Sequence, residues 1–117
     1  MYVTECVYQD RVQKFDSHGS FVLTWGTTGG EDGELDSPNG ICMGTRETVF
    51  VADTSNHRIQ KFTTGGVYIL DWGYKGTDEG TFDQPTDVAV DDEGNVYVVD
   101  SKNHRIQTYL PVRYVLP

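Results

Sequence analysis

Short apolar stretches recur along this chain, and polar, turn-forming residues separate them. The apolar stretches fall at 41–43, 49–52, 67–72, 88–90 and 96–99. The turns between such stretches fall at 17–20, 64–66 and 92–95. Short apolar stretches bounded by glycine-containing or asparagine-containing turns are typical of β-strands joined as hairpins. No window shows the period of an amphipathic helix, so the pattern predicts an all-β protein.

The strand pattern repeats with a fixed period. The motif Arg-[Val/Ile]-Gln-x-aromatic begins at Arg11, Arg58 and Arg105, which are 47 residues apart. Between 49–62 and 96–109, 8 of 14 positions are identical. Each full period contains four predicted strands, which is the arrangement expected of a β-propeller blade.

We divide the chain 1–117 into three blades of one partial propeller. Blade 1 (1–26) is incomplete and lacks its first, innermost strand. Blade 2 (36–73) is complete, and blade 3 (83–117) has an irregular last strand. The sequence Leu-Pro-Val-Arg-Tyr-Val-Leu-Pro stands at 110–117, where a glycine turn and a Trp-Gly strand are expected, although Tyr114-Val-Leu could form a short outer strand.

The repeated segments resemble a known family, the NHL repeat. The resemblance rests on Asp-x-x-Asn-His-Arg-Ile-Gln-x-aromatic at 53–62 and 100–109, and on the strand and turn order of 80–100. It extends over about 1–109, but the first unit has Glu5 in place of the aspartate and no Asn-His pair. The resemblance implies NHL-type blades of four short antiparallel strands in a propeller that commonly has six blades and usually serves in binding.

Three blades are too few to close a propeller, because such rings have at least four. An open row of blades would expose apolar side chains that a neighbouring blade should cover. We therefore predict self-association, with a homodimer completing one six-bladed ring. A larger ring, a trimer with shared blades, or a fragment of a larger propeller without independent function are the alternatives.

The repeated polar residues have a structural and a chemical interpretation. They are Asp53, Asn56, His57, Arg58, Asp100, Asn103, His104 and Arg105. The structural interpretation is a turn in which the aspartates can accept backbone N–H groups, the asparagines tolerate left-handed conformations, and histidine and arginine can join strands. A metal site needs several converging ligands, and each blade supplies one such histidine. We therefore favour the structural role and predict neither a metal site nor catalytic residues.

Two glycine-rich acidic segments, 27–40 and 74–87, connect the blades. Their charged side chains form the predicted ligand-binding face: Glu31, Asp32, Glu34, Lys75, Asp78 and Glu79. Such carboxylates could also bind Ca²⁺, but the spacing of a helix–loop–helix calcium site is missing, so no cofactor is the favoured prediction. Trp25 and Trp72 precede these segments, and we expect them to pack between blades rather than stack on a ligand.

The net charge of −9 disfavours binding to nucleic acid or to anionic membranes. No apolar run reaches the roughly 18 residues of a membrane-spanning helix, and no signal peptide is visible, so a complete chain would be cytoplasmic. Cys6 and Cys42 are expected to be unlinked thiols.

These observations favour a non-enzymatic binding scaffold for a protein or small-molecule partner. The alternative is a metal-dependent propeller enzyme of the lyase or lactonase type with its site on the ring axis.

Overall fold

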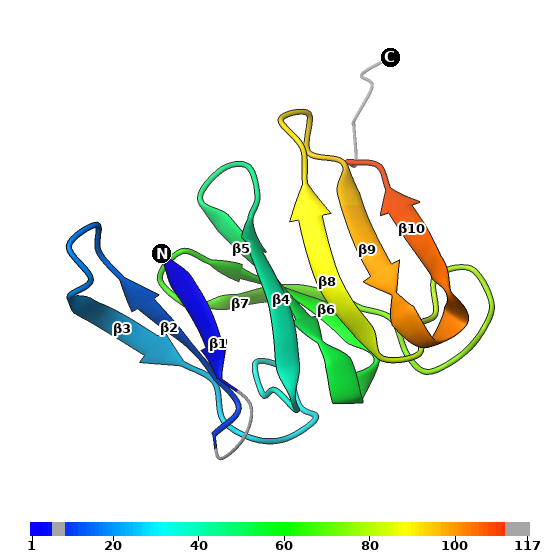
Figure 1. Cartoon of the computed structure of the whole chain (residues 1–117), viewed down its shortest axis with the longest axis horizontal. Helices are drawn as coiled ribbons and strands as arrows, with labels where there is room; N and C mark the ends of the chain where they lie inside the picture. The colour runs from blue at the N-terminus through cyan, green and yellow to red at the C-terminus, as the bar shows by residue number, and fades with distance from the viewer. Residues whose placement is uncertain (6–8, 112–117) are drawn as a thin grey trace.

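The computed structural model describes residues 1–5 and 9–111, which form three antiparallel sheets side by side (Figure 1). Blade 1 contains β1 (Tyr2–Glu5), β2 (Arg11–Phe15) and β3 (Phe21–Trp25). Blade 2 contains β4 (Pro38–Met43), β5 (Thr48–Asp53), β6 (Arg58–Thr63) and β7 (Tyr68–Trp72). Blade 3 contains β8 (Pro85–Val90), β9 (Val96–Asp100) and β10 (Arg105–Tyr109). The all-β prediction is confirmed.

Each sheet is a meander in which neighbouring strands are consecutive in sequence. Four strands are present in blade 2, whereas blades 1 and 3 have three each within the described residues. The predicted outer strand at Tyr114 and the thiol of Cys6 lie outside the described residues. Two short 3₁₀ turns, η1 (Thr54–Asn56) and η2 (Ser101–Asn103), are the helical elements of the described chain, and neither could cross a membrane.

The second strand of blade 2, β5, is buried along its whole length. Val49 and Val51 belong to the core between blades 1 and 2, and Phe50 and Ala52 belong to the core between blades 2 and 3. Successive strand residues point to opposite faces, so one strand supplies both cores. Full burial of such side chains stabilises a fold by about 1.5–3 kcal/mol each, so the contacts between blades contribute substantially to stability.

The connections between blades also enter these cores. The first inter-blade loop (27–35) ends at Leu35 and the second (74–82) ends at Phe82, and both side chains are fully buried. Gly73, with φ +104°, lets the chain turn against the Phe82 ring, because a Cβ at this position would overlap the ring. The conformation of the turn and the space around it therefore both require glycine.

The two tryptophans pack between blades, as expected. Trp25 of blade 1 lies 5.5 Å from Phe62 of blade 2, and Trp72 lies 5.3 Å from Tyr109 of blade 3, between ring centroids. Both indole N–H groups are buried without a hydrogen-bond partner in the described part of the chain. The rings therefore contribute through packing, which places each tryptophan at the seam between consecutive blades.

Candidate functional site

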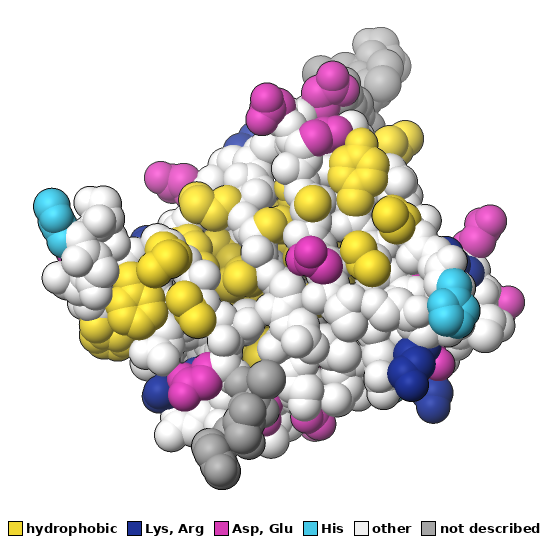
Figure 2. Space-filling model, viewed as in Figure 1, with side chains coloured by type: hydrophobic (Ala, Val, Ile, Leu, Met, Phe, Trp, Pro, Cys, Tyr) yellow, Lys and Arg dark blue, Asp and Glu magenta, His cyan; other side chains and the backbone are white. Residues whose placement is uncertain are grey.

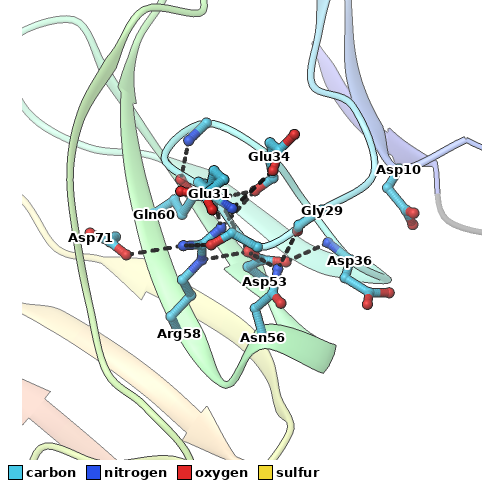
Figure 3. Close-up of polar contacts among 12 residues, drawn as sticks. Asp10, Gly29, Glu31, Glu34, Asp36, Asp53, Asn56, Arg58, Gln60 and Asp71 are labelled. Atoms are coloured by element: carbon cyan, nitrogen blue, oxygen red, sulfur yellow. Dashed lines mark hydrogen bonds and ion pairs between the residues drawn. The ribbon is translucent and has the colours of Figure 1, made fainter.

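The repeated polar residues of blade 2 converge on the carboxylate of Asp53, which is fully buried (Figure 3). Its Oδ1 accepts a hydrogen bond from the Asp36 backbone N–H at 2.8 Å. Its Oδ2 accepts from Asn56 Nδ2 at 3.0 Å, Arg58 Nε at 2.7 Å and Gln60 Nε2 at 3.1 Å. A buried carboxylate needs such compensation, because an unpaired charge is costly in a protein interior.

Arg58 connects this carboxylate to the first inter-blade loop. Its Nη1 donates to the Gly30 carbonyl at 3.0 Å, and its Nη2 donates to the carbonyls of Glu31 at 3.0 Å and Glu34 at 2.7 Å. Gln60 also binds the loop, since its Oε1 accepts from the Gly33 N–H at 3.0 Å. We call the Asp-Arg-Gln group a loop cradle, because it holds the loop that arrives from the preceding blade.

The same cradle recurs 47 residues later, in blade 3. Asp100 accepts from the Asp83 N–H and from Arg105 Nε, both at 2.8 Å. Arg105 donates to three carbonyls of the second inter-blade loop, those of Thr77, Asp78 and Thr81. The Arg105 side chain is 27% exposed, against 7% for Arg58, so the cradle of blade 3 is the more open of the two.

Blade 1 carries a variant of the cradle built on Glu5. Its Oε2 accepts from Arg11 Nε at 2.6 Å and from Gln13 Nε2 at 2.9 Å. The hydrogen bond from Arg11 lowers the pKa of Glu5 against the opposing effect of burial. Glutamate thus replaces the aspartate of the other blades as the acceptor. Among the described residues no inter-blade loop covers the Arg11 guanidinium.

In each motif the histidine, and not the asparagine, takes the left-handed conformation. His57 and His104 both have φ 54°, whereas Asn56 and Asn103 lie in the 3₁₀ turns. The asparagine side chains donate hydrogen bonds to the aspartate of their own blade and to a carbonyl of the preceding loop. The tolerance of asparagine for left-handed conformations is therefore not used here, and its amide serves in side-chain contacts.

His57 also joins blade 2 to blade 3. Its Nδ1 accepts a hydrogen bond from the Gln84 N–H at 3.0 Å. One repeat earlier Asp10 takes this place, because its Oδ1 accepts from the Ser37 N–H at 2.9 Å. Histidine and aspartate are thus interchangeable here as acceptors, which is a structural role that requires no metal and no catalysis.

The predicted ligand-binding residues occupy two different environments. Glu34 folds back into its own loop, where Oε1 accepts from the Glu31 N–H at 3.0 Å. The backbone carbonyls of Glu31 and Asp78 are bound by arginine. The exposed loop side chains are Glu31, Asp32, Lys75, Asp78 and Glu79. Within 1–5 and 9–111, no group of His, Cys, Asp or Glu is arranged to hold a metal ion.

Two contributions to the site were not anticipated. The glutamines Gln60 and Gln107 are part of the cradles, and the signal that could have identified them is the glutamine in every copy of the motif. Tyr68 donates its hydroxyl proton to Asp71 Oδ1 at 2.8 Å, and this bond raises the pKa of Tyr68 to about 12. Asp71 in turn accepts from Arg58 Nη1 at 3.2 Å, and no sequence pattern indicated this contact.

The cysteine in the described part of the chain lies in an environment that disfavours its thiolate. Cys42 is a free, half-buried thiol. Burial, with a smaller contribution from the negative charge of Asp87, raises its pKa to about 11. The thiolate, which is the reactive form, is therefore scarce at neutral pH.

The histidine contact can be tested with a matched pair of variants. His57→Ala removes the acceptor of the Gln84 N–H. His104→Ala removes a ring from a residue with the same backbone conformation, and among the described residues this ring makes no hydrogen bond. We expect His57→Ala to lose about 0.5–1 kcal/mol more of the free energy of unfolding, measured by urea denaturation. Equal losses would show that the Gln84 contact contributes nothing.

The cradle also predicts acid sensitivity. Burial opposes ionisation of Asp100, but hydrogen bonds from the Asp83 N–H, Asn103 and Arg105 outweigh it and lower the pKa of Asp100. Its contribution to stability is therefore complete above the ordinary carboxyl pKa of about 4, and it is lost as the pH falls through the lowered value. We expect the unfolding midpoint to fall below pH 4 and Asp100→Asn to flatten that dependence. An unchanged slope in the variant would contradict this assignment.

The described part of the chain folds into antiparallel meanders of three or four strands. Tryptophan side chains and loop cradles join each meander to the next. This arrangement defines a β-propeller-like repeat protein. Residues 35–62 and 82–109 match the family model of the NHL repeat. Two segments of the chain therefore match the NHL repeat, which confirms the resemblance seen in the sequence.

Two solved structures from Bacteroides thetaiotaomicron VPI-5482 have a similar fold. One is described as a “Putative phosphatase” (TM-score 0.66, 16% identity, 92% of this chain and 31% of that one). The other is an auxiliary nutrient binding protein (TM-score 0.64, 15% identity, 86% of this chain and 32% of that one). At these identities the likeness shows the fold alone, and the chain spans about a third of the length of either protein. No curated protein sequence matches the chain.

Proposed function

We propose that the protein is a non-enzymatic NHL-repeat scaffold, and that two copies of the chain complete one six-bladed ring. The single observation that carries the proposal is the exposure of the two outer blade surfaces. The blade 1 face is defined by Val3, Phe15 and Phe21, and the blade 3 face by Tyr97 and Ile106. Figure 2 shows apolar side chains exposed on this face of the molecule, over blades 1 and 3 and also between them.

Side chains at the equivalent positions of blade 2 are buried. Ile106 is 65% exposed, whereas its counterpart one blade earlier, Ile59, is fully buried. Val3 is 41% exposed, whereas its counterpart Val51 is fully buried. Exposed apolar surfaces of this kind mark sites of protein association. A neighbouring blade would cover both faces in the way that blades 1 and 3 cover blade 2.

The assembled ring would present its loops to a binding partner. The cradles use the backbone of the inter-blade loops, so side chains of these loops remain available at the surface. Asp32 and Glu79 are exposed in the two loops, and Lys75 is exposed in the second. The net charge of −9 favours a partner, either protein or small molecule, that carries positive charge.

Solution mass tests the proposal. We expect light scattering on a sizing column to give the mass of two chains, and that mass to persist as the loading concentration is lowered tenfold. A mass of one chain at every concentration would contradict the ring, and it would mean that the exposed faces are tolerated or are covered by a different protein.

A further inference from the structure

We infer that the copies associate head to tail, with the blade 3 face of one chain packed against the blade 1 face of the next. In this contact Tyr97 and Ile106 of one copy meet Val3 and Phe15 of the other. The inference rests on the proposed assembly and adds its polarity and its contact residues.

The seam between blades 2 and 3 is the template for this contact. Blade 2 contributes Phe50 and Ile59, and blade 3 contributes Val98, to one buried core. Tyr109 packs against the same core and lies 5.3 Å from Trp72. The seam therefore consists of aromatic and aliphatic side chains from the second and third strands of each blade.

Shifting this template by one repeat gives the proposed interface. Phe50 and Ile59 of blade 2 correspond to Tyr97 and Ile106 of blade 3, which are 37% and 65% exposed. On the other side Val98 and Tyr109 correspond to Val3 and Phe15 of blade 1, on β1 and β2. The two faces are different but complementary, so the contact is heterologous and can close into a ring.

The aromatic pair on blade 1 supports this assignment. Phe15 and Phe21 lie 6.2 Å apart with their rings at 77°, and the equivalent pair Phe62 and Tyr68 in blade 2 lies 6.4 Å apart at 79°. In blade 2 the pair receives Trp25 of the preceding blade. Blade 1 has therefore formed the same receiving surface.

Complementation between two variants tests the polarity. Ile106→Asp places a charge on the blade 3 face, and Val3→Asp places a charge on the blade 1 face. Both substitutions replace exposed side chains, so each chain should fold. We expect each variant alone to run as one chain, with the dimer dissociation constant raised about a hundredfold or more, because the contact would bury an unpaired carboxylate. Mixed in equal amounts, they should regain a two-chain species, since one intact pair of faces remains. Val67→Asp, at a 65% exposed turn position, is the matched control and should stay a dimer.

The outcomes separate this inference from the proposed function. A one-chain mass for the unmodified protein contradicts the ring and the inference together. A two-chain mass that only one of the two variants abolishes indicates contact between like faces, which keeps self-association and overturns the head-to-tail inference. Dimers of both variants, or no complementation on mixing, overturn it as well.

Discussion

Replacing Asp53 with alanine is expected to lower the free energy of unfolding by about 3–5 kcal/mol. The Arg58 side chain would be left 7% exposed with its Nε unpaired, and the Asp36 N–H would lose its acceptor. A domain of this size is stable by about 5–15 kcal/mol, so the change would remove a large fraction of its stability. Circular dichroism during urea denaturation measures the loss.

Glu5→Ala is the matched control for this change. It removes the equivalent acceptor of blade 1, but the Glu5 side chain is 40% exposed and the Arg11 side chain 29% exposed, so water can solvate the arginine that remains. We expect a clearly smaller loss than for Asp53→Ala. Equal losses would show that burial of the cradle is not what makes it important. Asp53→Asn, which keeps the shape but not the charge, should fall between the two.

Replacing Phe82 with alanine is expected to cost about 3–5 kcal/mol, the range for deletion of a fully buried aromatic ring. The ring is fully buried in the core between blades 2 and 3, packs 6.2 Å from Tyr109, and fills the space against Gly73. Its removal would leave a cavity at the seam of two blades. The size of the effect follows from the position of the ring, because rigid strands on both sides limit collapse into the cavity.

Tyr74→Ala provides the control for Phe82→Ala in the same loop. Tyr74 is 71% exposed, and its carbonyl accepts from the Phe82 N–H through the backbone, which the substitution leaves intact. We expect a change within about 0.5 kcal/mol, as for other exposed positions. Thermal unfolding followed by tryptophan fluorescence compares the two variants, since Trp72 lies at the affected seam. A small effect of Phe82→Ala would contradict the assignment of this ring to the core.

Several elements of the fold could be predicted from the amino-acid sequence alone. The apolar run Val-Phe-Val-Ala identified β5 as a strand, and the repeat of Arg-Ile-Gln identified β6 and β10 as equivalent strands. Asp53 was expected to accept a backbone N–H, and the Asp36 N–H is its donor. The strands were predictable because apolar runs and turn chemistry depend on residues close in sequence.

Other parts of the site could not be predicted from local pattern. Arg58 contacts carbonyls 24 to 28 residues earlier in the chain, and backbone carbonyls have no signature in the amino-acid sequence. At the seam between blades 1 and 2, Asp10 takes the place of His57 as the acceptor. The sequence did not predict this replacement, because the two residue types look unrelated until their N–H donors are known. The left-handed conformation of His57 likewise depends on how the asparagine side chain is used.

The sequence by itself therefore determined the all-β class, the 47-residue unit, the order of strands and the NHL resemblance, since each depends on the spacing and polarity of neighbouring residues. Only the tertiary structure decided that the motif is a cradle for the preceding loop and that each blade has one receiving and one donating face. Both properties arise when blades stack, because stacking brings together groups separated by more than half a repeat. The same stacking makes the outer faces of blades 1 and 3 different from each other.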